Sequence, residues 1–239
     1  MEFNYQSEYI HIPKCYETCN SYCCIGKNLN FLKHNFMMLP LLEQEFTEYT
    51  KSGAIKGLEK PKHIEKFQLK DGAIVRIYWL QCDLNGLCSP HENRPLICKL
   101  YPFLPKVDAN GRLKGYMPAS ISEIIFDKSN HPCTLVKNST NEICNQLNQN
   151  ILPLLKQPIY IFAFMVYELL LTYFKNWLNK KFETHLISQM PKENIKKYYK
   201  EIEIDLLLRR AWKNQECINS INDAYDEIVK IWGNFLPFK

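Results

Sequence analysis

The stretch HENRPLICKLYPF, residues 91–103, surrounds a single cysteine with residues that stiffen the chain. Arg94 and Pro95 precede Cys98, and the segment 101–103 (Tyr-Pro-Phe) follows it. Each proline fixes its own φ angle, so the backbone is restrained on both sides of the cysteine. A cysteine that only fills space in a hydrophobic core needs no such restraint. We therefore expect Cys98 to have a defined chemical role.

The chain has ten cysteines, and most of them occur in close groups. Eight are candidate metal ligands: Cys15, Cys19, Cys23 and Cys24, then Cys82, Cys88 and Cys98, and finally Cys133. The N-terminal residues 1–14 have neither a basic region nor an apolar run, so we expect no secretory signal and a cytoplasmic location. Thiols stay reduced there, and metal binding is the usual reason for grouped reduced cysteines.

Length and charge limit the class of protein further. The chain has 239 residues, 46% hydrophobic and 23% charged, which is typical of one soluble globular domain. Its net charge of +5 comes from 30 basic and 25 acidic residues that are scattered along the chain. Without a dense basic segment, we expect no nucleic-acid partner.

The cysteine spacing excludes several familiar metal motifs. The chain has neither the paired C-x2-C knuckles of a zinc ribbon nor the C-x2-C-x2-C run of a ferredoxin. The C-x3-C-x3-C spacing of residues 15–23 is one residue longer than the motif of radical S-adenosylmethionine enzymes. Neighbouring side chains diverge, so we expect Cys23 and Cys24 to serve two metals or two irons of one cluster.

Taken in order, these motifs resemble a known family. C-x3-C-x3-C-C at residues 15–24, C-x5-C at 82–88 and RP-x2-C-x2-YPF at 94–103 are similar to the YkgJ-type cysteine-cluster family. The resemblance covers residues 15 to about 133. It implies chelation of zinc or iron, and more weakly lysine N-methylation, because the family includes flagellin lysine N-methylases.

Three functions follow as alternatives. The first is a protein that holds an iron–sulfur cluster or zinc through cysteine thiolates, with Arg94 balancing their charge. The second is a methyltransferase that uses S-adenosylmethionine on a protein substrate. The third is an interaction module in which a structural metal supports a helical surface for a protein partner. A secreted disulfide protein is a distant fourth.

The expected fold class is α+β. A small-stranded, cysteine-rich metal module (residues 1–139) packs on a C-terminal helical bundle (140–239), and the two form one composite domain. We expect a helix over 36–52 and hairpins that turn at Asp71-Gly72 and Asn110-Gly111. Further helices are expected near residues 142–150, 155–180, 183–190 and 193–231.

Some residues have simpler interpretations. The apolar stretch 158–174 contains Glu168, which favours a buried core helix over a membrane span. Cys144 and Cys217 each stand alone in a helical pattern and are expected to be inert. Four polar residues near the cysteines are secondary candidates for ligands or acid–base groups, although a surface position is the simpler expectation for each: His91, His131, Asp83 and Glu92.

Overall fold

The two predicted turns each join a pair of antiparallel strands in the computed structural model, which describes residues 4–12, 15–25 and 36–237. The elements are, in order, α1 (Cys15–Thr18), α2 (Tyr22–Ile25), β1 (Met37–Leu42), α3 (Glu43–Lys51), β2 (His63–Gln68), β3 (Ile74–Cys82), the 3-10 helix η1 (His91–Asn93), α4 (Leu96–Leu100), β4 (Phe103–Val107), β5 (Leu113–Pro118), η2 (Ile121–Ile125), α5 (Thr134–Asn138), α6 (Thr140–Asn150), η3 (Leu154–Lys156), α7 (Pro158–Phe182), η4 (Ile187–Gln189), η5 (Lys192–Asn194), α8 (Ile195–Leu208) and α9 (Gln215–Trp232).

The larger sheet has three antiparallel strands in the order β1-β3-β2. The β2–β3 hairpin turns where predicted, at Asp71-Gly72. Gly72 has a φ of +92°, a conformation that costs glycine little, and the Asp71 carboxylate accepts a hydrogen bond of 2.9 Å from the Ala73 N–H. β3 supplies the central strand, with β-branched and aromatic residues along its length.

The predicted helix over residues 36–52 is wrong in its first part. Residues Met37–Leu42 form β1, which pairs antiparallel with β3 from Met37↔Cys82 to Leu42↔Ile77. Only Glu43–Lys51 is helical. Pro40 fits this arrangement because β1 is an edge strand, where the missing N–H is tolerated. The pairing also brings Cys82 to one end of the sheet.

The second hairpin, β4–β5, also turns where predicted. Gly111, at the turn, has a φ of +74°, and its N–H donates a 2.9 Å hydrogen bond to the Asp108 carbonyl. A Cβ atom at Gly111 would lie 2.2 Å from the Leu155 carbonyl oxygen. The absence of a side chain therefore allows this hairpin to contact η3 at the start of the helical half.

The helical half differs from the prediction in two places. The segment expected as one helix over 193–231 is two, α8 and α9, because Arg209 takes a left-handed φ of +54° at the end of α8. Asn214 then begins α9, where its side chain accepts a 2.7 Å hydrogen bond from the Cys217 N–H. Between residues 183 and 190 only the short η4 forms.

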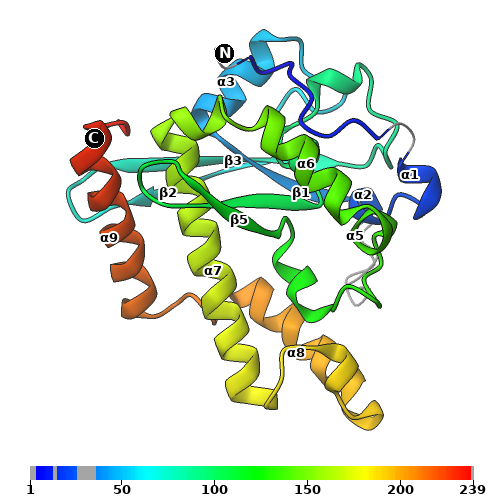
Figure 1. Ribbon diagram of the computed structural model, residues 1–239. Coiled ribbons are helices and arrows are strands. Elements are labelled where there is room, and N and C mark those ends of the chain that lie inside the picture. Colours follow the sequence, from blue (N-terminus) through cyan, green and yellow to red (C-terminus); the bar gives the residue numbers. More distant parts are fainter. Residues whose placement is uncertain (1–3, 13–14, 26–35, 238–239) are drawn as a thin grey trace.

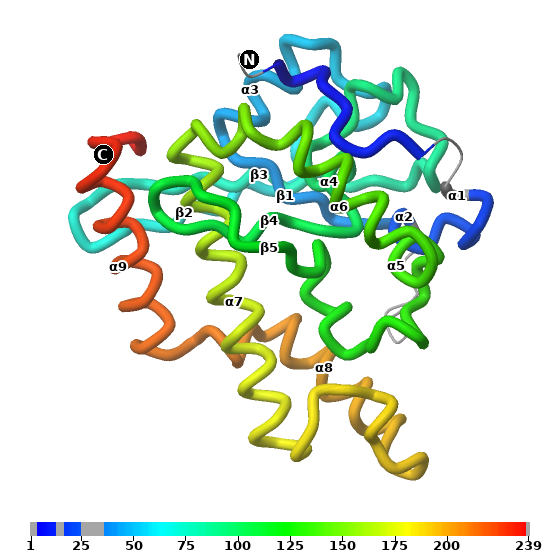
Figure 2. Tube along the Cα trace, viewed as in Figure 1, coloured from blue at the N-terminus to red at the C-terminus, as the bar shows by residue number. Residues whose placement is uncertain are grey.

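One hydrophobic core joins the two halves of the chain. It includes Tyr9, Leu100, Leu147, Ile161 and Ile228, which come from segments spread over the whole sequence. Within it, α7 packs against β4 and α9, as Figures 1 and 2 show. The predicted α+β class is confirmed.

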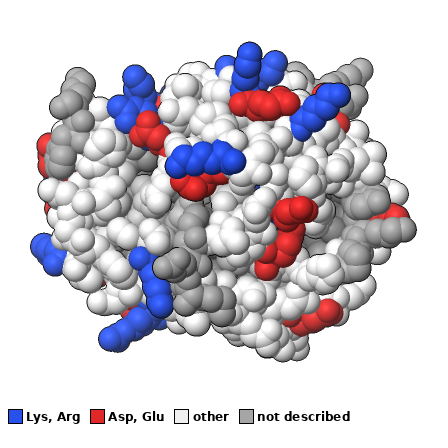
Figure 3. Space-filling model, turned by 90° about the horizontal axis from the view of Figure 1, so that it is seen from above, with Lys and Arg blue, Asp and Glu red and all other residues white. Residues whose placement is uncertain are grey.

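The long apolar helix belongs to this core. By length and composition alone, the stretch Pro158–Gln189 could cross a membrane. In the structure Ile161 of α7 is fully buried in this core, and Phe174 and Leu178 are fully buried in a second cluster that includes Tyr198 and Ile202 of α8. The Glu168 carboxylate pairs with the Lys106 ammonium at 3.1 Å. We interpret α7 as a core helix, as the sequence predicted. On the face in Figure 3, basic and acidic side chains are interspersed.

The contact between Gly111 and Leu155 gives a testable prediction. Gly111→Ala should lower the free energy of unfolding by about 2 kcal/mol more than Gly72→Ala, as measured by urea denaturation. Both glycines have positive φ angles, but a Cβ at Gly72 meets nothing within 4 Å. The control therefore isolates the clash with the backbone carbonyl. Equal losses in the two variants would contradict this assignment.

Candidate functional site

Two groups of thiols lie near one end of the three-stranded sheet, where α1, α2 and α5 gather in Figure 1. The first group, here called the sheet-end thiols, consists of Cys24, Cys82, Cys88 and Cys98. The second, here called the Tyr101 thiols, consists of Cys23 and Cys133, with Cys19 packed against it. The backbone of Cys15 begins α1, but its side chain lies outside what the structure describes.

Local backbone structure positions the sheet-end thiols. Cys82 is the last residue of β3, and the following turn has its Leu87 N–H hydrogen-bonded to the Leu84 carbonyl at 2.9 Å. Cys98 lies in the first turn of α4, where its N–H donates to the Pro95 carbonyl at 2.9 Å. Pro95 therefore sets the start of this helix.

A side-chain hydrogen bond connects Cys24 to the same region. The Ser21 hydroxyl, just before α2, donates to the Asn85 carbonyl at 2.6 Å. Asn85 lies in the turn that joins Cys82 to Cys88. Segments far apart in the sequence are thus connected directly, and the Cys24 thiol is brought to the other three.

Cys24 affects the ionisation of the other three sheet-end thiols. Burial raises the pKa of Cys88 to about 11, and the neighbouring Cys82 and Cys24 add to the rise. The pKa of Cys98 is raised well above its usual value, first by burial and then by Cys24, Cys88 and Cys82. These effects place the four cysteines in one region of the fold. Without a compensating cation, forming several thiolates here is unfavourable.

Arg94 supplies positive charge beside these thiols. It lowers the pKa of Cys24, after the larger effect of a hydrogen bond from Cys23, and it opposes the rise at Cys98. Its guanidinium is fixed by a 2.9 Å contact with a Glu8 carboxylate oxygen and a 3.1 Å hydrogen bond to the His91 carbonyl. The sequence predicts that Arg94 balances thiolate charge, and this role remains a prediction.

Cys23 and Cys24 do not diverge, contrary to expectation. Their sulfurs lie 3.8 Å apart in the short helix α2. Two thiolates on one tetrahedral zinc, each at about 2.3 Å from the metal, are also about 3.8 Å from each other. The pair connects the sheet-end thiols to the Tyr101 thiols. Cys23 raises the pKa of Tyr101, and Cys24 raises the pKa of Cys98.

The Tyr101 thiols surround buried polar groups. The Tyr101 hydroxyl donates a 2.5 Å hydrogen bond to Oε1 of Glu123, and Tyr101 also contacts Cys133. Burial raises the pKa of Cys133, and it raises the pKa of Glu123 to about 8. Glu123 was not identified from the sequence; its signal was an acidic residue inside the apolar run ISEII.

Thiols are suitable donors for a soft metal ion, but the described side chains are not already arranged as a complete set of metal ligands. Among the described side chains, no three His, Cys, Asp or Glu residues are already arranged to hold a metal ion. Four cysteines from separate segments nevertheless lie in one region, and thiolates are the preferred donors for zinc and iron–sulfur centres. Metal binding by these cysteines therefore remains a prediction.

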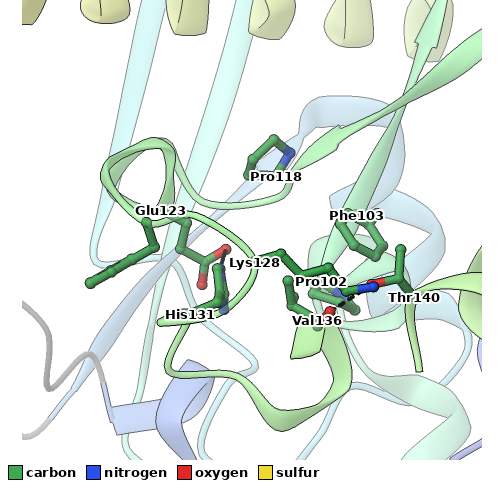
Figure 4. A pocket seen from close by; sticks show the side chains of 9 residues that line it. Pro102, Phe103, Pro118, Glu123, Lys128, His131, Val136 and Thr140 are labelled. Atoms are coloured by element: carbon green, nitrogen blue, oxygen red, sulfur yellow. Dashed lines mark hydrogen bonds and ion pairs between the residues drawn. The ribbon is translucent and has the colours of Figure 1, made fainter. Parts of the chain in front are cut away.

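Three of the four polar candidates are exposed: His91, which contacts Glu8 at 3.1 Å, Glu92, and Asp83, which follows Cys82 and raises the pKa of that thiol. The fourth, His131, is buried in the wall of a small cavity (Figure 4), and its Nδ1 accepts a 3.1 Å hydrogen bond from the Cys133 N–H. Cys144 in α6 and Cys217 in α9 belong to neither thiol group.

Two buried charged residues that the sequence did not reveal hold α4 in place. Lys99 is only 1% exposed; its ammonium donates to the Tyr5 carbonyl and lies 4.4 Å from the centre of the Tyr5 ring. The Glu45 carboxylate accepts a 2.7 Å hydrogen bond from the Leu96 N–H at the start of the same helix. Together these contacts fix the helix that carries Cys98.

No protein-family model matches the chain, and comparisons with curated proteins and with solved structures find no match. The resemblance to the cysteine-cluster family thus rests on the sequence motifs alone.

The burial of Glu45 predicts a pH dependence of stability. Burial raises its pKa from 4.5 to about 7 in the folded protein, so the folded state binds a proton more tightly than the unfolded state. This contribution is complete below about pH 4.5, is lost as the pH rises to about 7 and is absent above that pH. Glu45→Gln should therefore be more stable than the wild type by about 3 kcal/mol at pH 8, and by less than about 1 kcal/mol at pH 5.

Urea denaturation at the two pH values measures this difference. Glu48→Gln is the matched control, because Glu48 lies on the same helix but is 39% exposed in its ion pair with Lys51. A difference between Glu45→Gln and the wild type that does not change with pH would contradict the assignment.

Proposed function

We propose that this chain is a metal-binding cysteine-cluster protein whose sheet-end thiols hold zinc or an iron–sulfur centre. One observation carries the proposal: segments far apart in the sequence bring Cys24 near enough to Cys82, Cys88 and Cys98 to raise the pKa of each of those three thiols. Packing alone does not explain why four reduced thiols should share one buried region.

The electrostatics of the site support a cation at its centre. Ionised thiols repel each other here, and a bound metal ion would reverse that penalty and make their deprotonation favourable. Arg94, held by Glu8, would offset part of the remaining negative charge. The site would thus combine soft donors with a fixed positive neighbour.

The Cys23–Cys24 contact joins the two thiol groups, since Cys24 belongs to the sheet-end thiols and Cys23 to the Tyr101 thiols. A polynuclear centre, or two adjacent centres, would use this junction. A polynuclear or two-centre site also fits the irregular cysteine spacing better than a single four-cysteine zinc site would.

Removing one ligand tests the proposal. Protein purified without oxygen should contain bound zinc or iron by elemental analysis, and Cys98→Ser should lose most of it. Cys144→Ser is the matched control, because it removes an equally half-buried thiol outside the cluster and should keep the wild-type metal content. A brown protein with broad visible absorption would identify iron–sulfur, whereas zinc gives a colourless one. Metal-free wild-type protein, or unchanged content in Cys98→Ser, would disprove the proposal.

The methyltransferase alternative has a separate test. S-adenosylmethionine should be titrated into the metal-loaded protein in a calorimeter, and the alternative requires saturable heat. The interaction-module alternative instead requires that Cys98→Ser unfold the cysteine-rich region without any separate loss of catalysis.

A further inference from the structure

The outer edge of β2 is open to a further strand. β2 is the last strand in the order β1-β3-β2, and within the described ranges of the chain no strand other than β3 pairs with it. Ile64 on one face of this edge and Phe67 on the other are 41% and 40% exposed. An edge strand of this kind can accept a strand from another chain, because its outer backbone groups are unpaired.

The hydrogen-bond pattern shows which backbone groups of β2 point outward. The Leu69 N–H, just after β2, donates to the Ala73 carbonyl at 2.9 Å, and the pairing with β3 continues from there in the same register. In an antiparallel pair, alternate residues bond to the partner strand and those between them face away. The N–H and C=O groups that face away from β3 are therefore those of Ile64, Lys66 and Gln68. No hydrogen bond from the described part of the chain reaches them.

The charge of this edge is positive. The stretch 56–70 has five lysines and only two acidic residues. Lys62 and Lys66 are exposed, and neither forms an ion pair with a described residue. Glu65, in contrast, has its charge compensated within the fold, because its carboxylate accepts a 2.9 Å hydrogen bond from the Arg209 guanidinium. A partner strand with acidic side chains would therefore be attracted to this edge.

A second copy of β2 is a poorer partner for the same edge. Two copies that pair about a two-fold axis place residues of the same sheet face opposite each other. Pairing centred on Glu65 would put two carboxylates opposite each other, and pairing centred on Lys66 would do the same with two ammonium groups. Like charges at directly opposite positions are destabilising. The charge pattern thus disfavours self-association and favours a strand of opposite charge.

We propose that β2 binds an extended acidic segment of a protein partner, which adds to the sheet as a fourth strand. The backbone of that segment pairs with the outward groups of Ile64, Lys66 and Gln68. Acidic residues at every second position lie on the sheet face of Lys66, and the apolar residues between them lie beside Phe67 on the other face. β2 contains no cysteine, so the proposal is independent of metal binding.

Two peptides with one pattern test the charge of the partner. The alternating peptides EVEVEVE and KVKVKVK, each with a fluorescent label, are titrated with the full-length protein and followed by fluorescence anisotropy. The glutamate peptide should bind saturably, and the lysine peptide about tenfold more weakly, because its charges repel those of the edge. No saturable binding of the glutamate peptide, or equal binding of the two, overturns the proposal.

Two substitutions at one outward position separate backbone pairing from charge. Lys66→Gln removes only the charge and should weaken binding of the glutamate peptide about threefold. Lys66→Pro also removes the outward N–H, but no bond to β3, and should weaken binding about tenfold relative to the wild type. Lys51→Gln, which removes an exposed lysine on α3, is the control and should change nothing. Equal affinities in Lys66→Gln and Lys66→Pro overturn the addition of a strand.

Circular dichroism confirms that each variant is folded, and light scattering reports the oligomeric state. A wild-type dimer that Lys66→Pro abolishes would mean that a second copy occupies the edge, and this result overturns the proposal. If Lys66→Pro does not fold, Lys66→Glu decides the outcome. It should weaken binding of the glutamate peptide about tenfold by reversing the charge, and unchanged affinity overturns the proposal.

Discussion

The position of α4 depends on two buried charges, and the thiol site depends on α4. Glu45 accepts the first free N–H of this helix, and the Lys99 ammonium is satisfied by the Tyr5 carbonyl and ring. An unpaired buried charge is strongly destabilising, so the helix cannot shift without breaking these contacts. Cys98 lies between the two anchors and is therefore held at a fixed place beside β3. The N-terminal residues that supply Tyr5 and Glu8 complete the same arrangement.

Two buried carboxyls serve different ends in this protein. Glu45 has its acceptor oxygen paired with a backbone N–H, and its role is to hold structure. Glu123 is paired through only one oxygen, and its second oxygen faces His131 across a gap. Burial raises both pKa values, and the second carboxyl lines a cavity. The two buried carboxyls therefore differ in how completely their oxygens are hydrogen-bonded.

The proposed function rests on convergence rather than on any one motif. Each cysteine spacing is weak evidence by itself. Thiolates in one region repel each other, and a bound cation would remove that repulsion and favour their deprotonation. Arg94 would offset part of the same repulsion, and its own position is fixed by Glu8 and by the backbone of η1.

The sequence alone determined features that depend on a few neighbouring residues. The hairpin turns at Asp71-Gly72 and Asn110-Gly111 follow from glycine's access to positive φ, and the apolar run of α7 follows from composition. The grouping of the cysteines is also visible in the sequence, and the expectation of a metal follows from it.

Tertiary structure decided the rest. Residues 37–42 have helical spacing, but pairing with β3 makes them a strand, since strand formation depends on a distant partner. The meeting of Cys24 with Cys98, and the isolation of Glu123 beside His131, also exist only in the folded chain. The reason is physical: turns and helices are set by residues within a few positions, whereas burial, and the ionisation it controls, is set by whatever the fold brings alongside.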